Sequence, residues 1–285
     1  MRYLILLLLI ACQADIESVT LERERLCEDR LGNMYTCQEV TVSCNDLNER
    51  RAILRTTEHP DSIGTIVFTS NGAGNTFYGN AAPNVTLGLM DAGYNTVEIA
   101  WQGEYGWAQD NYGAGIPDTM CAYAEVVRYL SDDVLCATGN SGGAMQVSYG
   151  LAHYNLDDVL TTAVLTGGPP TADAVDACRS GRDGVNTAKL LDYVFGFDKC
   201  QAGDVEGSVD YIDANSVVHG DVEYTTFVSF ILGSRDPLNI ARAQKYYDVI
   251  TSDKKWVVID NVPHSVHKDT VGGQVIVNEL VTYCR

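Results

Sequence analysis

The chain has 285 residues, of which 46% are hydrophobic and 20% are charged. This composition is that of a globular protein, and it excludes intrinsic disorder, collagen-like repeats and a coiled coil as the main architecture. There are 19 Lys and Arg against 38 Asp and Glu, which gives a formal net charge of −19. Because such a surface repels a polyphosphate backbone, we do not expect nucleic acid as a partner. The length suits one domain with insertions.

The N-terminus has the pattern of a secretion signal. One positive charge, Arg2, precedes an apolar run that ends at the small residue Ala11, just before Cys12. The run is far shorter than the roughly 20 residues that a helix needs to cross a bilayer. We therefore expect residues 1–11 to be removed as a signal peptide.

Residues 9–12, Leu-Ile-Ala-Cys, resemble the lipobox of bacterial lipoproteins. The resemblance implies that Cys12 carries a lipid and anchors the protein to the outer membrane of a bacterial cell envelope. The alternative is a plain signal peptide cut nearby, which would give a periplasmic or secreted protein. We expect residues 12–26 to form a polar tether and residues 27–285 the folded domain, with membrane association through the lipid alone.

Cysteine usage supports export. Apart from Cys12 the chain has eight cysteines, at positions 27, 37, 44, 121, 136, 178, 200 and 284. An even set in an exported chain predicts four disulfides, and the absence of a Cys-x-x-Cys or His-rich cluster argues against a zinc site. Eight cysteines allow about 105 pairings. Two bridges between near neighbours are our hypotheses, Cys121 with Cys136 and Cys178 with Cys200.

The predicted elements begin with two half-buried strands, at 35–43 and 51–57, which we expect to pair as an antiparallel edge. Short apolar strands and helices then alternate to the C-terminus. The strands are expected at 64–69, 94–101, 134–138, 159–166, 224–232 and 255–259, and the helices at 84–92 with Asn84 as N-cap, 118–130, 144–153, 238–250 and 273–283. This alternation predicts an α/β fold with a mostly parallel central sheet and helices on both faces.

Residues 171–222 break the alternation. The segment is rich in Gly and Asp and contains Cys178 and Cys200. We expect it to form a disulfide-containing cap insertion over the carboxyl edge of the sheet.

The most informative motif joins the predicted strand 134–138 to the helix that follows it, and it reads Gly139-Asn-Ser-Gly-Gly143. A serine at a tight strand-to-helix turn is held in a strained backbone conformation, and a glycine two positions to either side lets strand and helix approach closely. The motif predicts that Ser141 projects above the sheet edge, beside the positive end of a helix. The alternative is a glycine-rich turn with an idle serine.

From about residue 35 onward the sequence resembles the α/β-hydrolase family, in which the nucleophile precedes the acid and the acid precedes the histidine. The resemblance implies that Asp236, in Gly-Ser-Arg-Asp-Pro after the insertion, is the acid. It implies that His264, in the loop after the last strand, is the base. His267 stays open as an alternative base, and Asp260 as an alternative acid.

The three residue types have distinct roles. A serine hydroxyl is a poor nucleophile unless a neutral imidazole takes its proton, and the imidazole needs an anion to orient it. The resemblance also implies an oxyanion hole of two backbone N–H groups, one of them from Gly142. The other comes from the loop Asn71-Gly-Ala-Gly-Asn75, where the family commonly has His-Gly. We expect Ala73 to donate, with Gly72 as the alternative.

Four aromatic residues, Trp101, Tyr105, Trp107 and Tyr112, lie at the end of the predicted strand 94–101 and just beyond it. Ligands bind outside the carboxyl ends of parallel strands, so these residues are candidates for lining a substrate cleft. Packing beneath the insertion is the alternative. No Lys or Arg cluster calls for a phosphorylated substrate, and an uncharged ester suits the acidic surface better.

Together these features predict a serine hydrolase that cleaves small-molecule or polymeric carboxylic esters through an acyl-enzyme, with no cofactor or metal ion. Lipase, polyester depolymerase and peptidase activities are alternatives on the same fold. A non-catalytic surface lipoprotein that uses the scaffold for binding is the competing class. The motif is also similar to Gly-Asp-Ser-Gly-Gly of chymotrypsin-like proteases. Those enzymes place histidine and aspartate before the serine on an all-β scaffold, whereas His59 is the only histidine before Ser141.

Overall fold

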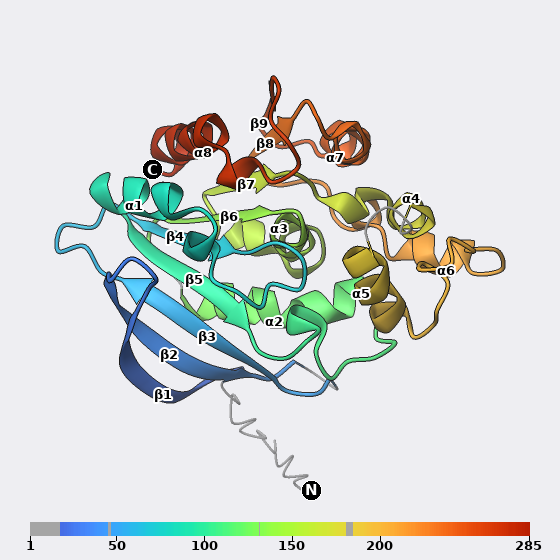
Figure 1. The fold of residues 1–285 in the computed structure, drawn as a ribbon, viewed down its shortest axis with the longest axis horizontal. Coiled ribbons are helices and arrows are strands. Elements are labelled where there is room, and N and C mark those ends of the chain that lie inside the picture. The colour runs from blue at the N-terminus through green and yellow to red at the C-terminus, as the bar shows by residue number, and fades with distance from the viewer. Residues whose placement is uncertain (1–17, 45–46, 131, 181–184) are drawn as a thin grey trace, which may run out of the picture.

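The computed structural model describes residues 18–44, 47–130, 132–180 and 185–285 (Figure 1). A nine-stranded sheet forms its centre, with the strand order β1-β2-β3-β5-β4-β6-β7-β8-β9. β1, β2, β3 and β5 pair antiparallel, and every pair from β5 to β9 is parallel. The strands are β1 Val19–Glu28, β2 Met34–Val42, β3 Arg50–Thr57, β4 Thr65–Thr69, β5 Asn95–Trp101, β6 Leu135–Asn140, β7 Thr162–Thr166, β8 Phe227–Gly233 and β9 Lys254–Ile259.

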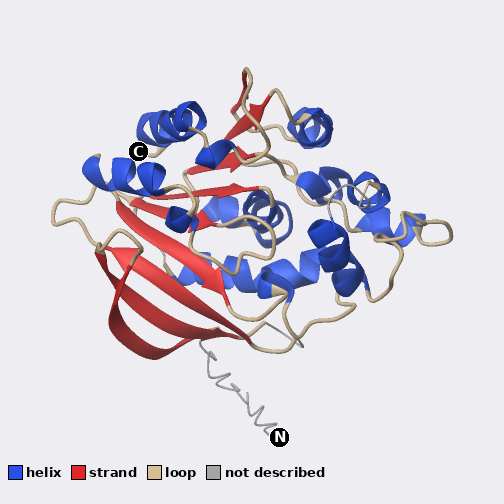
Figure 2. Cartoon of the chain, viewed as in Figure 1, coloured by secondary structure: helices blue, strands red, loops and turns tan. Residues whose placement is uncertain are grey.

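Helices cover both faces of this sheet (Figure 2). Side chains of α2, α3 and α7 pack into the core on one face, and those of α1 and α8 pack into the core on the other. The helices are α1 Pro83–Asp91, α2 Ile116–Tyr129, α3 Gly142–Tyr154, α4 Ala174–Arg179, α5 Val185–Phe195, α6 Val209–Ala214, α7 Pro237–Val249 and α8 Thr270–Tyr283.

The central strands are buried on both sides, as their continuous apolar runs predict. In β4, Ile66 and Phe68 belong to the core under α1 and α8, whereas Val67 belongs to the core under α2 and α3. This alternation follows from the two-residue period of a strand. The α/β fold class is therefore confirmed, with its mostly parallel sheet and its helices on both faces.

Two N-terminal details differ from expectation. Residues 19–26, expected to belong to a tether, form most of β1, which pairs with β2 and is joined to it by the disulfide Cys27–Cys37. Most side chains of this edge strand are exposed, so the strand carries little of the apolar signal that marks a buried strand. The helix expected to start after Asn84 begins at Pro83 with Ala82 as its N-cap, because proline suits a first turn where its missing N–H has no helical partner.

The predicted signal peptide and Cys12 lie outside the described residues. In the part of the chain that the structure does describe, no helix is long and apolar enough to span a membrane.

The eight remaining cysteines form four disulfides, and Cys178–Cys200 is confirmed. The pairing of Cys121 with Cys136 is wrong: Cys121 pairs with Cys44, and Cys136 pairs with Cys284. The reason is the sheet between them. Cys121 lies on α2 in one core, whereas the side chain of Cys136 on β6 points into the opposite core, where the C-terminal end of α8 brings Cys284.

The chain between β7 and β8 contains α4, α5 and α6, which gather on one side of the molecule beyond the strand ends (Figure 1). Ion pairs fasten the start of this cap to α7. Arg242 Nε lies 2.6 Å from Asp176 Oδ2, and Lys245 pairs with Asp173. Cys178–Cys200 links α4 to the chain after α5. The cap is therefore held at its first helix.

Candidate active site

Ser141 occupies the sharp turn between β6 and α3. Its backbone has φ 57° and ψ −110°, a conformation that residues with a side chain rarely adopt. The flanking glycines make this turn possible. A Cβ on Gly139 would lie 2.4 Å from Gly143 C, and a Cβ on Gly143 would lie 2.3 Å from Thr69 O. The glycines predicted from the motif therefore permit the close contact of strand and helix that holds Ser141 at the sheet edge.

Asp236 and His264 come from the ends of two neighbouring strands. Asp236 follows β8 and caps α7, while His264 lies in the loop after β9. His264 Nδ1 donates to Asp236 Oδ2 at 2.5 Å, and within the described residues His264 Nε2 has no hydrogen-bond partner. Ser141, Asp236 and His264 line the same cavity, of about 280 Å³. The structure thus brings together the three residues that the resemblance implied.

The carboxyl of Asp236 is held as an anion. Burial alone would raise the pKa of Asp236, but the hydrogen bond and charge of His264 and two hydrogen bonds from Asn239 outweigh it, so the pKa is lowered. An ionised Asp236 fixes the tautomer of His264 with its proton on Nδ1. In that tautomer Nε2 can accept a proton.

Asn239 is a partner that sequence reasoning missed. Its side-chain nitrogen donates to Asp236 Oδ1 at 3.0 Å and to Oδ2 at 2.9 Å, and lies 3.3 Å from His264 Nδ1. Asn239 is three residues after Asp236, in the first turn of α7, where a residue can reach back to the N-cap. That spacing is the signal in the sequence that could have identified it.

The two alternative residues, Asp260 and His267, lie outside this cavity. Asp260 is exposed and accepts a hydrogen bond from Ser234 Oγ at 3.3 Å. His267 is 2% exposed, packs on the ring of Tyr78 with 5.1 Å between centroids, and is not among the residues that line the cavity. The structure therefore places His264, and not His267, beside the acid.

His267 instead belongs to a buried polar cluster centred on Asn140, the residue before Ser141. With its amide nitrogen turned toward the loop after β9, Asn140 has three acceptors within reach of its two N–H groups: His264 O at 3.3 Å, His267 Nδ1 at 3.2 Å and Thr166 Oγ1 at 3.1 Å. Asn140 is fully buried, so these partners satisfy an amide that has no access to water. One side chain thereby ties the serine turn to β7 and to the loop that carries His264.

The candidate oxyanion donors lie next to each other. Gly142 begins α3, and a Cβ on it would lie 2.1 Å from Gly72 O, so the loop after β4 rests on the helix start. Trp107 fixes this loop: its ring nitrogen donates to Gly72 O at 3.0 Å, and its backbone N–H donates to Ala73 O at 3.0 Å. Among the described residues, neither Ala73 N–H nor Gly142 N–H has a hydrogen-bond acceptor. Both donors are free for a ligand.

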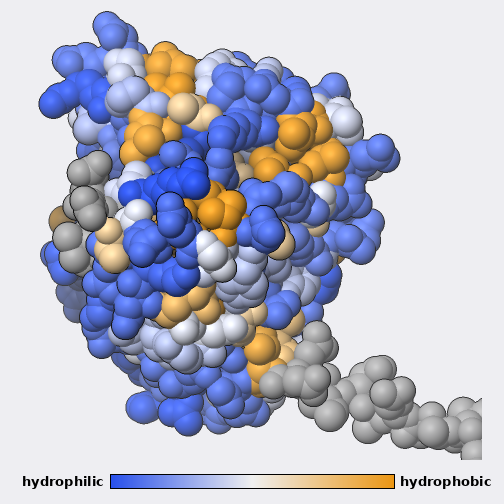
Figure 3. Space-filling model, turned by 90° about the vertical axis from the view of Figure 1, so that its right-hand side faces the viewer, coloured by the Kyte–Doolittle hydropathy of each residue, from blue (hydrophilic) through white to orange (hydrophobic). Residues whose placement is uncertain are grey.

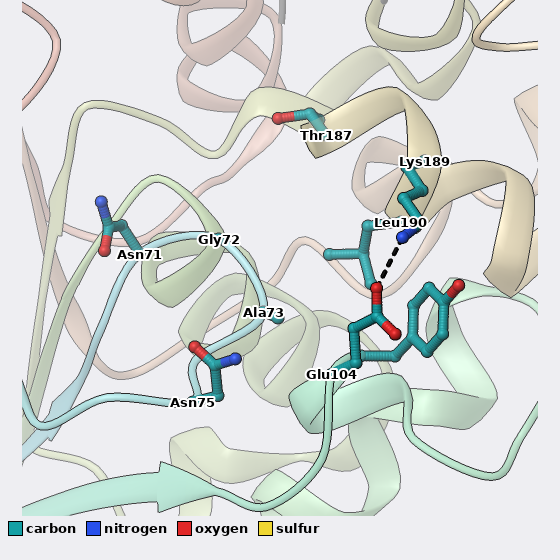
Figure 4. A pocket seen from close by; sticks show the side chains of 9 residues that line it. Asn71, Gly72, Ala73, Asn75, Glu104, Thr187, Lys189 and Leu190 are labelled. Carbon is teal, nitrogen blue, oxygen red and sulfur yellow. Dashed lines mark hydrogen bonds and ion pairs between the residues drawn. The ribbon is translucent and has the colours of Figure 1, made fainter. Parts of the chain in front are cut away.

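A second cavity, of about 390 Å³, adjoins this loop (Figure 4). Thr187 lines both cavities. Of the four aromatic residues considered for a substrate cleft, Tyr105 lines the second cavity, and Trp101 and Trp107 are buried in the core. Tyr112 is exposed and packs edge-on against Tyr193 of α5. Within the described ranges, no group of three or more His, Cys, Asp or Glu side chains could hold a metal ion.

Comparisons with known proteins identify the fold. The sequence matches no protein-family model and no curated protein. Solved structures do match the fold. A dienelactone hydrolase from Anabaena variabilis is 15% identical with a TM-score of 0.55, and the match covers 88% of this chain and 99% of that one. Mouse α/β hydrolase domain-containing protein 10 is 12% identical with a TM-score of 0.58, covering 85% and 96%. A monoacylglycerol lipase from Paleococcus ferrophilus is 13% identical with a TM-score of 0.54, covering 81% and 98%.

At these identities the likeness establishes the α/β-hydrolase fold. The expected α/β-hydrolase fold is thereby confirmed, and the structure itself shows the cap insertion between β7 and β8.

The buried His267 should make the protein sensitive to acid. Burial, followed by the charges of Lys268 and His264, lowers its pKa from 6.5 to about 3. Below pH 6.5, His267 therefore binds a proton in the unfolded chain but not in the folded chain. The free energy of unfolding then decreases as the pH is lowered. Between pH 7 and pH 5 the free energy of unfolding should fall by about 2 kcal/mol more in the wild type than in His267→Gln.

Urea unfolding at the two pH values measures this difference. His219→Gln, at an exposed position in the cap, is the matched control and should follow the wild type. Parallel pH curves for the wild type and His267→Gln would contradict the buried, neutral His267.

Proposed function

We propose that the protein is a serine hydrolase that cleaves carboxylic esters through an acyl-enzyme intermediate, with Ser141 as nucleophile, His264 as base and Asp236 as the acid that orients it. The observation that carries the proposal is the shared cavity: a strained serine opens into the same space as a histidine that is hydrogen-bonded to a carboxylate. These are the residue types that nucleophilic catalysis requires, and the base is held by its acid as that chemistry needs.

The first half of the reaction forms the acyl-enzyme. His264 Nε2 takes the proton of Ser141 Oγ as Oγ bonds to the ester carbonyl carbon, and the carbonyl electron pair moves to the oxygen. The N–H groups of Ala73 and Gly142 hold this oxyanion, aided by the positive end of α3. The intermediate then collapses, the bond to the alcohol oxygen breaks, and the alcohol leaves with the proton from His264.

The second half releases the acid. A water molecule gives a proton to His264 and attacks the acyl carbon, and the oxyanion forms again in the same place. When the bond to Oγ breaks, Ser141 recovers its proton from His264 and the carboxylic acid leaves. Asp236 keeps its negative charge throughout and stabilises the imidazolium in both halves.

We also propose that the protein is exported and lipid-anchored through Cys12, outside the cytoplasm of a bacterial cell. The four disulfides support an oxidising compartment. Lipase, polyester depolymerase and peptidase activities would use the same three residues, and they are alternatives that differ in the substrate cleaved.

A fluorophosphonate probe should label the wild type on Ser141, because an activated serine displaces fluoride from such a phosphorus centre whereas an ordinary serine does not. Ser141→Ala should abolish labelling and lower kcat/KM for p-nitrophenyl acetate by at least about 1,000-fold. Ser43→Ala, at a serine that lines neither cavity, is the control and should label normally. A folded wild type without labelling would contradict the proposal and favour the binding protein.

Asn239→Asp tests the hydrogen bonds to the acid. A second carboxylate beside Asp236 removes a donor and favours the protonated imidazole, so the acid limb of kcat/KM should move to higher pH by about one unit. The pH profile with p-nitrophenyl acetate measures the shift. Asn278→Asp, exposed on α8, should leave the limb in place, and an unshifted limb in Asn239→Asp would contradict this role.

A further inference from the structure

The second cavity is placed to receive part of the substrate. Ala73 lines it, so it adjoins the proposed oxyanion site, and Thr187 lines both this cavity and the one that contains Ser141. A group bound in the second cavity is therefore close to an ester held at Ser141. The side chains that line this cavity therefore help to determine which substrates bind.

Free polar groups surround this cavity. Figure 4 shows Asn71, Asn75 and Thr187 around the hollow, with Leu190 reaching in from the opposite side to Asn71. In the described part of the chain, the side-chain amides of Asn71 and Asn75 have no hydrogen-bond partner. Each amide offers two donors and an acceptor. Both are available to a bound molecule.

The charges at the cavity neutralise each other. Lys189 Nζ lies 2.6 Å from Glu104 Oε1, and it also lies 5.5 Å from the ring centroid of Tyr105. Tyr105 stacks on Tyr193 with 3.7 Å between centroids, which fixes the aromatic wall. No unpaired cation is left among these lining residues to attract an anionic ligand, and the net charge of −19 repels one.

A long alkyl chain fits these walls poorly. It would bury the two free amides without partners, and each such group costs on the order of tenfold in binding. A ligand with several hydroxyl groups would satisfy the amides instead. The surface on the cap side agrees with this, because hydrophilic side chains separate its apolar ones into small patches (Figure 3). A lipid interface favours a continuous apolar surface.

We propose that this cavity binds a neutral, hydroxyl-rich group such as a sugar ring, and that the substrates are O-acylated sugars or similar polyols. The proposal rests on the ester hydrolysis proposed above. The amides of Asn71 and Asn75 and the hydroxyl of Thr187 would bond to the ligand hydroxyls, while Leu190 and the edge of Tyr105 would contact its carbon atoms.

The test compares three acetates: an O-acetylated methyl β-xyloside, hexyl acetate, and p-nitrophenyl acetate as the reporter of Ser141-dependent turnover. Wild-type kcat/KM should be at least about tenfold higher for the xyloside acetate than for hexyl acetate. Asn75→Leu, which keeps the volume but removes the amide, should lower this ratio by about tenfold or more. Asn278→Leu, an exposed position on α8, should leave the ratio unchanged.

Two outcomes would overturn the inference and leave the proposed function standing. Both require that p-nitrophenyl acetate is cleaved by the wild type and not by Ser141→Ala. The first is a wild type that prefers hexyl acetate or treats the two esters equally. The second is an Asn75→Leu variant that keeps the wild-type ratio. If no ester is cleaved in a Ser141-dependent way, the proposed function itself fails, and this inference fails with it.

Discussion

The site depends on one backbone constraint, the turn that carries Ser141 between β6 and α3. At Gly139, Gly142 and Gly143, a Cβ would lie within 2.1 to 2.4 Å of a backbone atom, so the strand and the helix meet at a distance that only glycine allows. The turn holds Ser141 at a positive φ above the sheet edge. It also starts α3 directly against the loop after β4, which puts the free N–H groups of that loop and of the helix in one place.

Buried polar contacts then fix the other loops relative to this turn. Asn140 reaches the loop of His264 from the turn itself, and Asn239 reaches Asp236 from α7. A buried amide that loses its partner is costly, so each contact allows few alternative positions. The histidine loop is thus held from the side of the serine as well as from the side of the acid. Such support from surrounding residues is what keeps reacting groups in position.

Features encoded locally could be predicted from the sequence, and features that depend on the final packing could not. The motif around Ser141 and the strand and helix periods of the parallel half are local patterns, and they predicted the elements and Ser141. Asp236 and His264 were implied by the resemblance to the α/β-hydrolase family and not by a local pattern. Strand β1 was not predicted, because its side chains are mostly exposed and its sequence has no apolar pattern that marks a buried strand. The disulfide partner of Cys121 could not be predicted, because it depends on which side of the sheet each cysteine lies. Cys121 and Cys136 are near neighbours in sequence but lie in opposite cores. The roles of Asn140 and His267 rest on contacts between the ends of β6 and β7 and the segment after β9.

The most direct measurement is a crystal structure of the protein after reaction with a phosphonate ester, which imitates the tetrahedral intermediate of ester cleavage. We expect phosphorus bonded to Ser141 Oγ and the phosphonyl oxygen about 3 Å from the N–H groups of Ala73 and Gly142. His264 should lie within hydrogen-bond distance of the adduct and still be bonded to Asp236. An adduct on another residue, or a phosphonyl oxygen turned away from both N–H groups, would contradict the proposed mechanism.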